Sequence, residues 1–200
     1  MPALKSLFAS AVLFSAVPAF AADYELDPSH STAQFSVRHM MVSTVRGQFD
    51  KVTGTATIDE KDASKSKVNV SIDAKSINTR EPKRDEHLRS PDFFETAKFP
   101  TLTFASTKVE KSKDGKYLIT GDLTMRGVTK PVTLTAELTA PQKSPWGFSV
   151  RGVTATGKLN RKDWGLNWNK ALEAGGVLVS DEVQLVIDAE LKEPAPKPVN

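Results

Sequence analysis

Residues 68–75 read Val-Asn-Val-Ser-Ile-Asp-Ala-Lys, and their apolar and polar side chains alternate without a break. Successive side chains of a β-strand point to opposite faces, so this period of two predicts a strand with one buried face. The pattern recurs in a strand that ends at Met125 and in residues 33–39, 45–49, 52–58, 102–109, 132–138, 148–153 and 183–191. The sequence therefore predicts an all-β domain of about eight strands.

The connections between these strands favour a closed antiparallel barrel. Most are short, and residues 113–116 hold an Asp-Gly pair that is typical of a hairpin turn. Closing a sheet on itself removes its exposed edges, although a β-sandwich also satisfies the alternation. Because successive strands are joined by hairpins rather than long crossings, we predict a closed antiparallel barrel of about eight strands.

One segment interrupts the alternation. Residues 77–101 read INTREPKRDEHLRSPDFFETAKFPT, in which charged residues crowd together before Phe93 and Phe94. Residues 85–89 can form a short helix, with Pro82 near its start and Pro91 soon after its end, where proline is tolerated. This helical insert is interpreted either as a plug for one end of the core or as a plug that is also a wall of a ligand site.

The chain divides into three regions. Residues 1–21 contain Lys5, an apolar run at 7–17 and Ala-Phe-Ala at 19–21, a pattern typical of a cleaved signal peptide. We therefore predict a mature protein that begins at Ala22 or Asp23 and resides in the periplasm. The barrel should occupy residues 22–192, and residues 193–200 should form an extended, disordered, Pro-rich tail.

Composition excludes several classes of function. Without residues 1–21, which hold one lysine and no acid, the formal charge falls from +3 to +2. That balance argues against a nucleic-acid partner, and the absence of a polybasic cluster argues against a stable membrane anchor. The chain has no cysteine, which excludes thiol nucleophiles, an acyl anchor, thiolate-bound zinc and dithiol redox chemistry.

No group of residues predicts catalysis. The three histidines are His30, His39 and His87, and none belongs to a metal-binding motif of the HExxH type. We therefore expect no catalytic residue, metal or cofactor. Two alternatives remain: an envelope hydrolase or isomerase that uses His30 or His39 as a base, and a ligand-free stress or interaction module.

A second irregular segment reads NRKDWGLNWN at residues 160–169. Trp164 and Trp168 lie among Asn and Gly residues, which is typical of a tight loop at the rim of a barrel. Such a tryptophan can close the end of the core, and a second one four residues later favours an aromatic wall for a ligand.

At these residues the chain resembles the YceI-like family, across essentially all of residues 23–191. The matching motifs are DPSHS at 27–31, FSVRH at 35–39, STVRGQF at 43–49, RDEHLRSPDFF at 84–94, FP at 99–100, LTMRGVTKP at 123–131, RKDWGL at 161–166 and VSDEV at 179–183. A mild departure is Trp164, where the family often has another aromatic residue. The resemblance implies a periplasmic, eight-stranded antiparallel, lipocalin-like barrel, extended by the helical insert. This barrel would hold a polyisoprenoid lipid, such as an isoprenoid quinone or a prenyl phosphate or alcohol, and the resemblance implies no catalytic residue. A homodimer stays open.

Alternation then nominates the residues that would contact this lipid. One phase of the strands supplies an inward-facing set: Phe35, Val37, Phe49, Ile72, Phe104, Leu123, Leu134, Phe148 and Ile187. The two irregular segments supply aromatic side chains for the barrel mouth: Phe93, Phe94, Phe99, Trp164 and Trp168. Head-group contacts are expected from Arg84, His87 and Arg89. Burying a tail contributes roughly 0.8 kcal/mol per methylene-sized group, against about 0.5–1.5 kcal/mol for a head-group hydrogen bond, so affinity should come from the tail.

Overall fold

A computed structural model describes residues 21–173 and 175–194. All but the last residue of the predicted signal peptide, and most of the Pro-rich tail, lie outside these residues. Within them, no helix has both the length and the apolar character needed to cross a bilayer.

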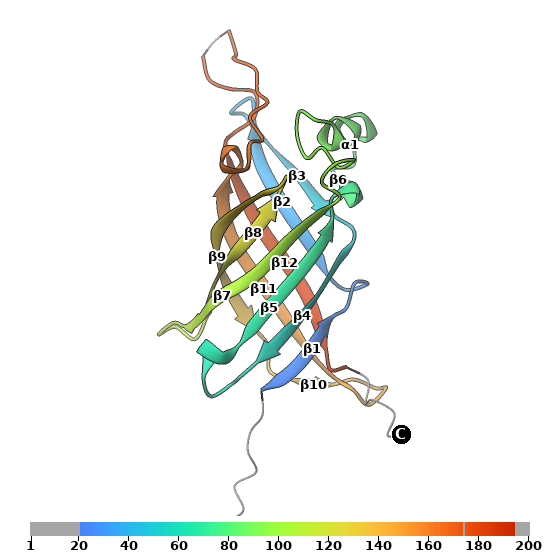
Figure 1. Ribbon diagram of the computed structural model, residues 1–200, viewed down its shortest axis with the longest axis vertical. Coiled ribbons are helices and arrows are strands. Elements are labelled where there is room, and N and C mark those ends of the chain that lie inside the picture. The colour runs from blue at the N-terminus through green and yellow to red at the C-terminus, as the bar shows by residue number, and fades with distance from the viewer. Residues whose placement is uncertain (1–20, 174, 195–200) are drawn as a thin grey trace, which may run out of the picture.

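The described residues form one antiparallel sheet that closes into a barrel (Figure 1). Its strands are β1 (Ala22–Leu26), β2 (Thr32–His39), β3 (Ser43–Phe49), β4 (Val52–Ile58), β5 (Lys67–Asp73), β6 (Ile77–Asn78), β7 (Thr101–Lys111), β8 (Tyr117–Met125), β9 (Val128–Leu138), β10 (Gln142–Lys143), β11 (Ser149–Asn160) and β12 (Glu182–Lys192). Single turns of 3-10 helix span Ala63–Lys65, Ala74–Ser76 and Arg161–Trp164.

Apart from the two-residue strands β6 and β10, ten strands form the barrel, and four of these combine into two bent strands, which gives eight. β1 pairs with β4 and β2 pairs with β3, so β1–β2 and β3–β4 each run as one long strand with a bend. β12 pairs with β1, β2 and β11, which closes the ring. The predicted eight-stranded barrel is confirmed, and the sandwich alternative is wrong. β1 is not among the predicted strands, because its alternation is carried only by the buried Tyr24 and Leu26.

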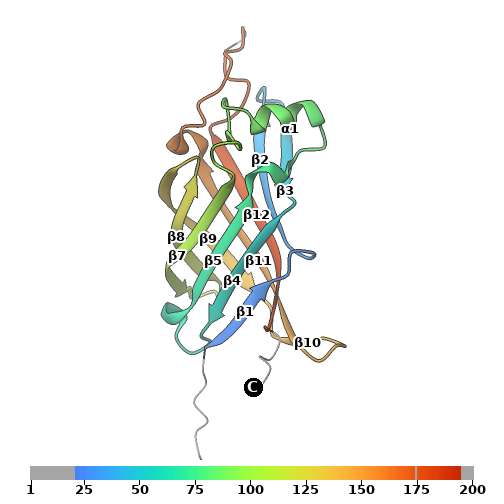
Figure 2. The ribbon, with the colours of Figure 1, turned by 45° about the vertical axis from the view of Figure 1, so that its right-hand side comes forward.

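The two ends of the barrel differ (Figures 1 and 2). Helix α1 (Pro82–Arg89) lies near the β2–β3 turn and the segment between β11 and β12, and we call this the α1 end. The loop that contains β10 lies at the other end, together with both termini of the described chain.

Helix α1 begins earlier than the predicted residues 85–89. The Glu81 side chain accepts a hydrogen bond from Lys83 N, and Pro82 occupies the first turn, where its missing N–H leaves no bond unmade. Asp85 is buried and accepts bonds from Thr79 N (2.8 Å) and Thr79 Oγ1 (2.5 Å). These bonds anchor the helix to the residue that follows β6.

Arg126, in the β8–β9 turn, joins the two irregular segments. Its Nη1 donates to Gly165 O and its Nη2 to Pro91 O, both at 2.8 Å. Phe99 covers the same turn: a Cβ added to Gly127, where φ is +73°, would lie 2.8 Å from the Phe99 ring. The insert and the loop after β11 are thereby fixed beside each other at the α1 end.

Candidate functional site

The barrel encloses a cavity of about 430 Å³, within the usual range of ligand sites. Inward-facing apolar side chains of the barrel strands line most of it. At the α1 end part of the lining comes from outside the strands, and we call the following residues the rim: Arg84, His87, Leu88, Phe93, Phe94, Trp168, Leu178 and Val179. A long apolar interior that ends in a rim of aromatic and cationic side chains suits an elongated amphipathic molecule.

Most of the residues nominated by alternation do line this cavity. Eight of the nine strand positions face it: Phe35, Val37, Phe49, Ile72, Phe104, Leu123, Leu134 and Ile187. From the irregular segments, the lining includes Phe93, Phe94, Trp168, Arg84 and His87. Whether these side chains contact a ligand stays a prediction.

Phe148 does not line the cavity, so its expected inward orientation is wrong. It lies at the β10 end, is 36% exposed and stacks on Trp146, with ring centroids 6.2 Å apart. β11 begins at Ser149, so Phe148 belongs to the preceding loop, where alternation no longer fixes the direction of a side chain.

Trp164 and Trp168 have different roles. Trp164 is 2% exposed, lies outside the cavity lining, and donates from Nε1 to Leu123 O at 3.0 Å. It is a plug of the core, which corrects its placement at the ligand site. Gly165 follows it with φ at +75°, a left-handed residue that ends the 3-10 turn and allows Trp168 to reach the cavity.

Two other nominated residues also lie outside the cavity lining. Phe99 covers Gly127 at the β8–β9 turn. Arg89 donates from Nε to Lys75 O and from Nη2 to Ile77 O, which ties the end of α1 to β6 and the turn before it. Both residues were predicted to contact the ligand because they belong to the insert. Local sequence does not define which side of an irregular segment faces the interior.

Three aromatic rings meet at the rim. His87, Phe93 and Trp168 have ring centroids 4.9–5.3 Å apart, and His87 lies edge-on to both of the others. His87 Nε2 is also 2.8 Å from Asp92 Oδ2. This cluster joins the insert to the loop after β11, so one wall of the rim is built by segments about 80 residues apart in sequence.

Cationic groups complete the rim. Arg84 donates from Nε to Thr79 Oγ1 and from Nη2 to Thr79 O, which holds its guanidinium at the cavity wall. Arg161 is 3% exposed and also lines the cavity. Burial lowers the pKa of the Arg161 guanidinium, and Asp181, 3.2 Å from Nη2, opposes that shift. Arg161 is not among the predicted ligand residues, although it belongs to the RKDWGL motif at 161–166.

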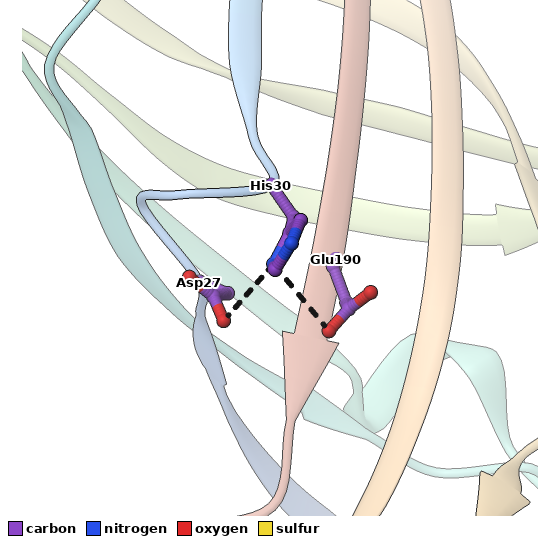
Figure 3. Close-up of side chains that lie close together, drawn as sticks. All are labelled: Asp27, His30 and Glu190. Atoms are coloured by element: carbon purple, nitrogen blue, oxygen red, sulfur yellow. Dashed lines mark ion pairs between the residues drawn. The ribbon is translucent and has the colours of Figure 1, made fainter. Parts of the chain in front are cut away.

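One candidate metal-ligating cluster occurs in the described residues, and it lies outside the cavity (Figure 3). His30 Nδ1 is 3.4 Å from Asp27 Oδ2 and 3.9 Å from Glu190 Oε1. Lys192 Nζ lies 3.9 Å from the same Asp27 oxygen, so a cation of the protein already faces this carboxylate. The cluster joins the bend between β1 and β2 to the end of β12.

The two histidines of the enzyme alternative are separated by the barrel wall. His39 lines the cavity, whereas His30 is 65% exposed on the outside. Ser29 Oγ is 3.2 Å from His30 Nδ1 but also donates to Asp27 Oδ1 at 2.6 Å. That arrangement caps a turn, and it lies away from the cavity in which a substrate would be held.

Comparisons with known proteins agree with this architecture. A family model described as a YceI-like domain matches residues 24–191. Protein YceI of Escherichia coli O157:H7 is 44% identical over 94% of this chain and 95% of its own length. A crystal structure of a Campylobacter jejuni YceI protein is 32% identical, covers 79% of this chain and 90% of its own, and superposes with a TM-score of 0.68.

Two more distant structures share the fold. Burkholderia cenocepacia BcnA superposes with a TM-score of 0.73 at 19% identity, over 82% of this chain and 98% of its own. A polyisoprenoid-binding domain from Saccharophagus degradans superposes with a TM-score of 0.59 at 18% identity, over 87% of this chain and 99% of its own.

Proposed function

Because the chain belongs to the YceI-like family, we propose that it is a periplasmic protein that holds one long-chain polyisoprenoid lipid inside its barrel, for transport or storage. The observation that carries this proposal is the apolar cavity between the β10 end and the rim. The polyisoprenoid-binding domain of Saccharophagus degradans, which has the same fold, supports the choice of ligand class.

The lining explains how such a lipid would bind without a catalytic step. An apolar tail gains roughly 25 cal/mol for each Å² removed from water, and the strand residues offer it an apolar wall along the barrel. The rim is where a polar head group would lie, because Arg84, His87 and Arg161 are found there or next to it. Arg84 would strengthen binding most for a phosphate, through a charge-assisted hydrogen bond.

Filling the cavity tests this proposal. Leu123→Trp adds a large ring at a lining position, so we expect an intact β circular-dichroism spectrum but at least about tenfold weaker binding of a fluorescent prenyl probe. The control is Trp146→Phe, which changes a side chain that is 82% exposed at the β10 end. Mass spectrometry of organic extracts should find an isoprenoid with the wild type and less with Leu123→Trp. An interior site would be contradicted if Leu123→Trp and Trp146→Phe bound the probe equally tightly and yielded equal amounts of isoprenoid on extraction.

A further inference from the structure

Three consecutive apolar residues are exposed at the tip of the β2–β3 hairpin. Met40, Met41 and Val42 have exposed fractions of 44%, 58% and 76%. Among the described residues, the other exposed large hydrophobic side chains are Trp146 and Phe148, at the β10 end. Adjacent exposed apolar side chains are unfavourable in water, and such patches mark surfaces that contact a protein or a membrane.

The backbone of this turn is also strained. Met40 and Met41 have φ angles of +50° and +63°, and Val42 N donates to His39 O at 3.1 Å. Turns with two central residues of positive φ strongly favour Asn-Gly, since side chains with a Cβ resist this conformation. Because both methionines are exposed, packing does little to offset that strain. A turn that is suboptimal for folding and apolar in water indicates selection for contact with something else.

The turn lies directly above the rim of the cavity. Met40 N donates to Leu178 O at 2.8 Å, and His39 forms a β-bridge with Val179. His39, Leu178 and Val179 all line the cavity, so the exposed tip continues its apolar wall beyond the end of the barrel. Figure 1 shows this hairpin at the α1 end, beside the lower part of the segment before β12, which projects further from the barrel.

A cation lies at the turn itself. Arg38 donates from Nη2 to Met41 O and from Nη1 to Thr44 Oγ1, which places its charge at the turn. Lys170, whose backbone O accepts a bond from Leu178 N, adds a second cation in the adjoining segment, which also contains the acid Glu173. Apolar side chains next to cations fit the interface of a bilayer that contains anionic lipids.

We propose that the Met40–Val42 turn docks the barrel reversibly on a lipid bilayer that contains anionic lipids. The apolar tip enters the interfacial region while Arg38 and Lys170 face lipid phosphates. The rim then lies against the membrane, so a polyisoprenoid can pass between bilayer and cavity without crossing bulk water. This inference rests on the proposed lipid-binding function and adds the surface with which the protein exchanges its ligand.

A variant that improves the turn for folding separates docking from stability. The triple variant carries Met40→Asn, Met41→Gly and Val42→Thr, which replace the three exposed apolar side chains of the turn. We expect an unchanged or higher Tm and at least about tenfold weaker co-flotation with vesicles of phosphatidylethanolamine and phosphatidylglycerol. Trp146→Ser, at the β10 end, is the control and should float like the wild type.

A second measurement keeps this test independent of lipid binding itself. A fluorescent prenyl probe delivered from cyclodextrin should bind equally to the wild type and the triple variant, whereas its transfer from vesicles should be slower for the variant. If the wild type does not float with vesicles, or if the triple variant floats and transfers like it, docking is refuted. The first of these results is also expected if a partner protein covers the turn. If cyclodextrin-delivered probe does not bind the wild type, the proposed function fails, while co-flotation still reports on docking.

Discussion

Arg161 supports the cavity wall through its hydrogen bonds. Its guanidinium donates to the carbonyl oxygens of Ser180, Leu166 and Trp168 and to the Asp181 carboxylate. These acceptors belong to the loop between β11 and β12, which otherwise has little regular structure to satisfy its backbone. One buried side chain therefore fixes the loop that carries Trp168 to the rim.

Asp27 contributes to stability in a similar way, on the outside of the barrel. Hydrogen bonds from the Ser29 hydroxyl and backbone N–H lower the pKa of the Asp27 carboxyl from 3.8 to about 2, and the His30 ring adds to the shift. A carboxyl whose pKa is lower in the folded state stabilises the fold above its unfolded pKa. That stabilisation should be lost as the pH falls from about 4 to about 2.

We therefore expect Asp27→Ala to reduce the free energy of unfolding by about 1–2 kcal/mol at pH 7, after allowing for solvent screening. Urea unfolding at pH 7, 4 and 3 measures the effect, which should shrink as the pH falls. Asp62→Ala is the control, since Asp62 accepts the same two bonds from Ser64 but its side chain is more exposed, at 43% against 17%. A pH-independent difference, or an equal loss in both variants, would contradict this assignment.

At the scale of elements, the insert combines a structural part and a part that faces the cavity. Arg89 and Phe99 attach it to the barrel, whereas Phe93 and Phe94 line the cavity. Phe94 lies edge-on to Phe49 with ring centroids 5.6 Å apart, and the ring centroids of Phe93 and Trp168 are 5.3 Å apart. The alternatives of plug and ligand wall thus describe different residues of one segment.

Phe93→Ala combined with Phe94→Ala should speed release of a bound prenyl probe by about tenfold and change its capture less, because loss of contacts acts mainly on the off-rate. Stopped-flow displacement measures both rates. Phe99→Ala is the matched control: it belongs to the same insert but lies outside the cavity, so it should lower Tm without changing release. The assignment fails if the double variant releases the probe at the wild-type rate while remaining folded, or if Phe99→Ala accelerates release equally.

At the scale of the whole molecule, the barrel combines a closed sheet with an apolar cavity. Protein interiors are normally close-packed, and the lining atoms of a cavity lose contacts that a ligand can restore. The proposed lipid would therefore act as part of the core. Its binding to the folded state alone shifts the folding equilibrium.

This linkage predicts that a saturating prenyl ligand raises the Tm. At a free ligand concentration of 100 times Kd, the expected stabilisation is about 2.7 kcal/mol. Differential scanning fluorimetry with and without prenyl alcohol measures the shift. Leu123→Trp, which fills part of the cavity in advance, should show a smaller shift at the same concentration. Equal shifts in both proteins would place the ligand outside the barrel.

Local sequence predicted most of the strands, and most of the residues that it placed at the cavity do line it. Alternation along a strand assigns each side chain to one face, and the buried face of a closed sheet must be the interior, so Phe35, Phe104 and Ile187 could be placed without a structure. The insert was recognisable because it breaks that period. How the insert attaches to the rest of the barrel could not be recognised from the sequence.

Tertiary contacts decided the remainder. Trp164 and Trp168 lie four residues apart, yet one plugs the core and the other lines the cavity, because Leu123 accepts a bond from the first and the His87–Phe93 pair packs on the second. Contacts with Leu178 and Val179, which line the cavity, place the exposed Met40–Val42 turn above it. Outside a strand no period constrains a side chain, so its direction depends on residues that are distant in sequence and close only in the folded barrel.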